Sequence, residues 1–84
     1  MSDLTRILRK MGDNPRGVHF SELRKICEFY FGIPRQGSGS HCIFKTPWAG
    51  NPRINIQNDK GKAKSYQVKQ VLKAIELIKA NDDF

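Results

Sequence analysis

The sequence predicts an α+β domain in which helices cover one face of a small antiparallel sheet. Two stretches near the N-terminus place apolar residues at helical spacing. A central stretch alternates apolar and polar residues, and the last stretch returns to helical spacing. The expected order is therefore helix, helix, three short antiparallel strands, helix. The 84 residues suffice for one domain, spanning residues 1–84, with a thin hydrophobic core.

Three apolar stripes define the expected helices. A first helix is expected at about residues 2–12, with the stripe Leu4, Ile7, Leu8 and Met11. In the second helix Ser21 is the expected N-cap and Gly32 ends the helix in the C′ position. Its stripe consists of Leu23, Ile26, Cys27, Tyr30 and Phe31. The last helix carries the stripe Val68, Val71, Leu72, Ile75 and Ile78.

The strands are expected at residues 33–36, 40–46 and 53–57, the first of them confined to an edge by Pro34. Successive side chains of a strand point to opposite faces of its sheet. If Phe44 points into the core, His41 and Lys45 face outward. The third strand then contributes outward residues by the same alternation, namely Arg53, Asn55 and Gln57. We expect function on this open face.

The charge balance predicts a polyanionic partner. Fifteen Lys and Arg residues against eight Asp and Glu give a net charge of +7, which favours nucleic acid. The stretch 58–65 is expected to be a basic, flexible loop before the last helix. It brings Lys60, Lys62 and Lys64 close to a helix N-terminus, where phosphate binds readily. A P-loop is excluded because its first glycine and its Ser or Thr are missing.

The cysteines and the ends of the chain carry no sign of metal binding or targeting. Cys27 and Cys42 lack paired short spacing, so we expect a reduced intracellular protein, although spacing alone leaves a disulfide between them open. A zinc site that also used His19 and His41 would lack the usual spacings, and we expect no metal or cofactor. No apolar run is long enough to span a membrane, and no signal peptide begins the sequence. These features favour the cytoplasm.

His41 is the candidate catalytic residue. It follows a run of small residues, 37–40, that lets the backbone approach a ligand closely. An imidazole can take or give a proton near neutral pH. Four cations lie nearby in the sequence: Arg35, Lys45, Arg53 and Lys60. This combination suits work on a phosphodiester. The alternative interpretation is a polar histidine at a strand end with no catalytic role.

The span from Phe20 to Ile75 resembles the HicA family of small toxins from toxin–antitoxin modules. The resemblance is carried by Gly39-Ser40-His41, Ile43-Phe44-Lys45, Ile54-Asn55-Ile56-Gln57, Lys60-Gly61-Lys62-Ala63-Lys64 and Tyr66-Gln67-Val68-Lys69-Gln70. It implies a double-stranded-RNA-binding-like fold with an extra N-terminal helix. It also implies an mRNA-cleaving RNase that is monomeric when free and is held inactive by a HicB-type antitoxin. The family's functional histidine maps onto His41.

These observations give a hypothesis of metal-independent RNA cleavage with His41 as general acid or base. The candidate RNA-binding residues are Ser40, Lys45, Arg53, Lys60, Lys62, Lys64 and Lys69. Lys45, Arg53 and Lys60 are the candidates for stabilising the charged transition state. The second acid or base stays open among Tyr66, Lys62 and water.

Two other function classes fit the same residues. A non-catalytic module that reads double-stranded RNA would need only the lysines around the start of the last helix. A protein-interaction domain would instead offer its open sheet face to an acidic partner. Electrophoresis of RNA after incubation with the protein and a chelator distinguishes a cleaving enzyme from a module that only binds RNA. A flat salt dependence of binding would favour the protein-interaction domain.

Overall fold

The computed structural model describes residues 3–34, 36–38, 41–46 and 53–80. The helical elements are α1 (Asp3–Asp13), the 3₁₀ turn η1 (Pro15–Gly17), α2 (Phe20–Phe31) and α3 (Ser65–Ala80). The strands are β1 (Gln36–Ser38), β2 (His41–Lys45), β3 (Arg53–Asp59) and β4 (Lys62–Ala63). They form one antiparallel sheet in the order β1-β2-β3-β4. The predicted α+β class and the order of helices and strands are confirmed, and β4 is an addition.

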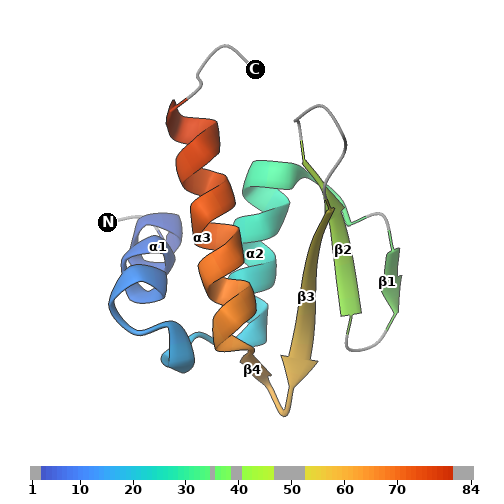
Figure 1. Cartoon of the computed structure of the whole chain (residues 1–84). Coiled ribbons are helices and arrows are strands. Elements are labelled where there is room, and N and C mark those ends of the chain that lie inside the picture. Colours follow the sequence, from blue (N-terminus) through green and yellow to red (C-terminus); the bar gives the residue numbers. More distant parts are fainter. Residues whose placement is uncertain (1–2, 35, 39–40, 47–52, 81–84) are drawn as a thin grey trace.

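The helices lie on one side of the sheet (Figure 1). α2 and α3 pack against the sheet, and α1 packs on α2 and α3. All three helices and the sheet contribute buried apolar side chains, among them Ile7, Met11, Leu23, Ile26, Phe44, Ile56, Val68, Val71 and Ile75. The predicted N-terminal helix is thus an integral part of the core.

The register of β2 and β3 confirms the predicted faces. Cys42 lies opposite Ile56, and both side chains are buried against the helices. On the other face His41 lies opposite Gln57 and Lys45 opposite Arg53. His41 and Arg53 are exposed. The alternation of a strand therefore brings the predicted polar residues onto the open face of the sheet.

The predicted start of the second helix is wrong by two residues. His19, not Ser21, is the N-cap of α2. The Glu22 carboxylate accepts the His19 backbone N–H at 2.9 Å, and the side chain of Phe20 is buried. This hydrogen bond and the burial of Phe20 start the helix two residues earlier than predicted from Ser21. At the other end Gly32 ends α2 as predicted, although it is the C-cap and does not occupy the C′ position, and its φ is 87°.

The predicted flexible loop at 58–65 is also wrong, because this stretch forms a β-hairpin. β3 continues to Asp59, and the two turn residues Lys60 and Gly61 have φ values of 53° and 87°. Positive φ at both positions is typical of two-residue hairpin turns. The Asn58 side-chain Oδ1 accepts the Gly61 N–H at 2.6 Å and stabilises the turn. The edge strand likewise differs from the prediction: β1 spans Gln36–Ser38 and so includes the first two residues of the small-residue run 37–40.

Both cysteines are free and buried in the core. They come from α2 and β2, two elements in contact. Burial, together with the nearby Cys42, raises the pKa of the Cys27 thiol. The thiol of Cys27 therefore stays protonated at neutral pH, and the residue packs as a small hydrophobe.

Candidate nucleic-acid interface

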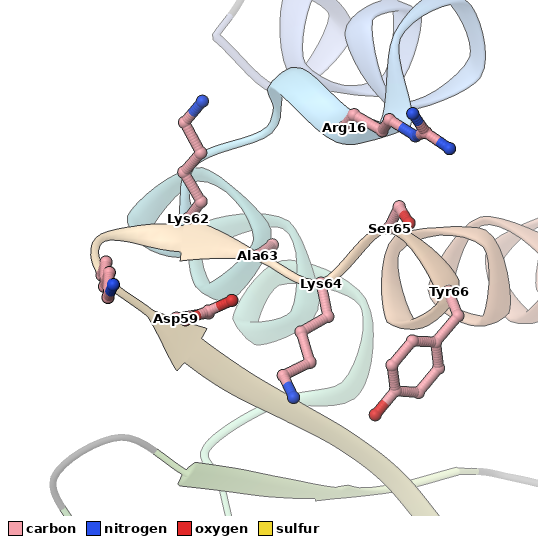
Figure 2. A pocket seen from close by; sticks show the side chains of 8 residues that line it. Arg16, Asp59, Lys62, Ala63, Lys64, Ser65 and Tyr66 are labelled. Carbon is pink, nitrogen blue, oxygen red and sulfur yellow. The ribbon is translucent and has the colours of Figure 1, made fainter.

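An open hollow of about 710 Å³ lies where the β3–β4 hairpin meets the start of α3 (Figure 2). Its lining residues are Arg16, Asp59, Lys60, Lys62, Ala63, Lys64, Ser65 and Tyr66. The lining carries four cationic side chains and one carboxylate, so the hollow is strongly positive. Such a surface attracts a phosphate-bearing ligand.

Backbone hydrogen bonds hold the hairpin against the start of α2. The Ala63 N–H donates to the Val18 carbonyl and the Phe20 N–H donates to the Gly61 carbonyl, both at 3.0 Å. His19 forms an isolated antiparallel bridge with Lys62. This pairing brings η1, and with it Arg16, to the hairpin lysines. Arg16 was not among the predicted site residues, because no local pattern predicts that residue 16 meets residues 60–64.

The start of α3 supplies the third side of the hollow. The N–H groups of Gln67 and Val68 both donate to the Lys64 carbonyl at 3.0 Å, so the helix begins at Ser65. Ser65 and Tyr66, the first two residues of the helix, line the hollow. The positive end of the helix dipole therefore adds to the charge of the lysines.

His41 lies at the same end of the sheet as the hollow. Its partner in the register is Gln57, two residues before the end of β3 at Asp59. The distance along β3 from Gln57 to Asp59 is therefore about 7 Å. Lys45 and Arg53 instead pair with each other four residues from the His41–Gln57 pair, a separation of about 13 Å along the strands.

The predicted RNA-binding residues thus divide into three groups. Lys60, Lys62 and Lys64 gather at the hollow. Lys45 and Arg53 lie at the far end of the open sheet face, and Lys69 is exposed on α3 outside the lining. Ser40 lies outside the described residues.

Gln67 is a buried polar residue that was not among the predicted site residues. Only 5% of its surface is exposed. Its Oε1 accepts the Gln57 backbone N–H at 2.8 Å, and its Nε2 donates to the Tyr66 Oη at 3.4 Å. The signal was present in the sequence: Gln67 stands four residues before Val71 and eight before Ile75, on the buried side of the helix.

Comparisons with known proteins return no family model, no curated protein and no solved structure that matches this chain. Within the described ranges, no group of three or more His, Cys, Asp and Glu side chains is placed to hold a metal ion. None of the helices in those ranges has both the length and the apolar character needed to cross a bilayer. Function is therefore inferred from the chemistry of the hollow and of His41.

Proposed function

We propose that this protein is an endoribonuclease that binds RNA phosphates at the basic hollow and cleaves the chain with His41. The observation that carries the proposal is the position of His41 at the same end of the sheet as the hairpin lysines. A titratable side chain close to phosphate-binding cations is the minimum that RNA cleavage requires. The resemblance to HicA toxins supports the same activity.

RNA carries its own nucleophile, which limits what the protein must supply. His41, acting as base, takes the proton of the ribose 2′-hydroxyl, and the 2′-oxygen attacks the adjacent phosphorus. The bond from phosphorus to the 5′-oxygen breaks, and an acid returns a proton to that oxygen. The products are a 2′,3′-cyclic phosphate and a 5′-hydroxyl. Tyr66, Lys62 and water are the candidates for the acid.

The two groups of cations take different parts in this proposal. The hairpin lysines lie at the same end of the sheet as His41 and stabilise the negative charge that develops on the phosphate. Lys45 and Arg53 are about 13 Å away along the strands, at the opposite end of the open sheet face. Their role is to bind flanking phosphates of an RNA strand that crosses the open sheet face.

The proposed substrate is messenger RNA in the cytoplasm, and the proposed inhibitor is an antitoxin of the HicB type. A protein that covers the open sheet face would block both His41 and the flanking cations. The net charge of +7 favours a partner with an acidic surface.

The first test is cleavage of an RNA oligonucleotide in the presence of a chelator. We expect fragments that end in a 2′,3′-cyclic phosphate, and no cleavage at a position where the ribose lacks its 2′-hydroxyl. Tight, salt-dependent binding without cleavage would instead favour the double-stranded-RNA-binding module. Absence of RNA binding would favour the protein-interaction domain.

Reversing two charges of the hollow tests the binding surface. Lys62→Glu combined with Lys64→Glu is expected to lower RNA affinity by at least about tenfold. The slope of log affinity against log salt concentration should also decrease by about two, which corresponds to two lost phosphate contacts. Neither lysine is part of the buried core, so the melting temperature should change little. Fluorescence anisotropy at several salt concentrations measures both quantities.

The control is Arg9→Glu combined with Lys79→Glu, which changes the net charge equally at two exposed positions outside the hollow. If both double variants weaken binding to the same extent, the attraction is a property of the whole molecule and the hollow is not the binding surface.

A further inference from the structure

Tyr66 combines exposure with a fixed hydroxyl group. It stands in the first turn of α3 and lines the hollow, and 55% of its surface is exposed. Its Oη receives a hydrogen bond from the Nε2 of Gln67 at 3.4 Å. An exposed tyrosine whose hydroxyl is held by a buried side chain is constrained in a way that a solvated surface tyrosine is not.

The hydrogen bonds of Gln67 determine what the Tyr66 hydroxyl can do. The Gln57 backbone N–H can only donate, so the atom of Gln67 that faces it at 2.8 Å must be the carbonyl oxygen. The amide nitrogen therefore faces Tyr66, and an amide NH₂ can only donate as well. In this contact the phenol is the acceptor, and its own proton is left for another acceptor.

The acceptor that the surroundings favour is a phosphate oxygen. Figure 2 shows the side chains of Lys64 and Tyr66 extending in the same direction, whereas that of Lys62 extends the opposite way. A cation and a neutral donor directed alike can bind two non-bridging oxygens of one phosphate. A carboxylate or carbonyl of the protein would compete for the phenol proton. Asp59 is the only acidic residue of the lining, which also carries four cationic side chains, so the lining as a whole favours a phosphate.

We propose that the Tyr66 phenol donates a hydrogen bond to a non-bridging phosphate oxygen of bound RNA, beside Lys64, and that Gln67 is the residue that positions it. This inference rests on the proposed RNA-binding function. It makes Tyr66 a substrate-contacting residue whose contribution is hydrogen bonding, not charge. It also links the hollow to the catalytic strand pair, because Gln67 holds the backbone of Gln57, which lies opposite His41.

Tyr66→Phe keeps the ring and removes only the hydroxyl. With an RNA probe made uncleavable by 2′-deoxy substitution, we expect the affinity to fall about tenfold, as for loss of a hydrogen bond to a charged group. The dependence of affinity on salt should stay that of the wild type, because a neutral donor releases no counterion. Lys64→Gln should lower the affinity and also reduce the salt slope by about one.

Two matched controls separate these effects from general ones. Tyr30→Phe makes the same chemical change about 15 Å along α2 from its start. Lys79→Gln removes one charge about 21 Å along α3 from Ser65. Neither residue lines the hollow, and neither variant should change the affinity by more than about twofold.

The outcomes distinguish the inference from the function on which it rests. If Lys64→Gln weakens binding and Tyr66→Phe binds as the wild type, the phosphate surface stands and the role of the phenol is overturned. A loss in Tyr66→Leu alone would give the ring a stacking role instead, which also overturns hydrogen-bond donation. If the wild-type protein binds no RNA, the proposed function and this inference fall together.

Gln67→Glu tests the positioning role. The carboxylate can still accept the Gln57 N–H, but its second oxygen would accept the phenol proton instead of donating to the phenol. The phenol is then withdrawn from the ligand. We therefore expect Tyr66→Phe to change the affinity less than twofold in the Gln67→Glu background, against about tenfold in the wild-type background. Equal effects in both backgrounds would remove Gln67 from the proposal.

Discussion

His41→Ala is expected to lower the rate of RNA cleavage by about 10²–10⁴, the usual cost of losing a positioned general acid or base. The fold should survive, because His41 is exposed on the open face of β2 and truncation leaves no cavity. Binding of the proposed antitoxin should survive as well, since an interface that covers the site uses many contacts besides one imidazole. The measurements are cleavage of labelled RNA, a thermal melt, and growth after induced expression without antitoxin.

Asn55→Ala is the matched control for His41→Ala. Asn55 is exposed on the same face of the sheet, lies opposite Ile43, and carries no group that titrates near neutral pH. It should retain cleavage within a few-fold of the wild type. A folded His41→Ala protein that still cleaves RNA and arrests growth would remove His41 from the mechanism. A His41→Ala protein that fails to fold would instead show that the residue is structural.

Glu22→Gln is expected to destabilise the protein by about 2–3 kcal/mol at neutral pH. The Glu22 side chain is 14% exposed and accepts bonds from Lys10 at 3.0 Å and Arg6 at 3.2 Å, both from α1. Burial alone would raise the pKa of this carboxyl. The hydrogen bonds from the His19 N–H, Lys10 and Arg6 outweigh burial and lower the pKa from 4.5 to about 2. Urea denaturation of both proteins measures the difference.

The pH dependence follows from the direction of this shift. The unfolded chain binds a proton at Glu22 below a pH of about 4.5, whereas the folded protein binds it only near pH 2. The stabilisation is therefore complete above pH 4.5 and is lost as the pH falls toward 2. In Glu22→Gln this loss should be absent, so the stabilities of the variant and the wild type should converge toward pH 2.

Glu28→Gln is the control for Glu22→Gln, on the same helix. Glu28 forms a surface pair with Arg24 at 3.7 Å, and both side chains are almost half exposed. Pairs of this kind contribute at most about 0.5 kcal/mol. Equal destabilisation in the two variants would contradict a special role for Glu22. RNA binding of folded Glu22→Gln should match the wild type, because Glu22 does not line the hollow.

The sequence by itself determined the features that depend on local periodicity. The stripe of Ile7 and Met11 predicted α1, and the alternation around Cys42 and Phe44 predicted which face of β2 is buried. These predictions succeed because a helix or strand exposes one face to the core at a fixed repeat, and every residue within the element carries that information. The placement of His41 on the open face follows from the same alternation.

Only the tertiary structure decided which distant segments meet. Backbone hydrogen bonds join Val18 to Ala63 and Phe20 to Gly61, and they help to fix the hairpin turn. The same pairing brings Arg16 to the hollow. The pairing of β2 with β3 placed Arg53 beside Lys45 and far from His41, although all three belong to one face. The sequence places Gln67 on the buried side of α3 but does not reveal its partner, since its amide accepts a hydrogen bond from a strand residue ten positions away. Such contacts depend on packing between elements, and no local repeat in the sequence encodes them.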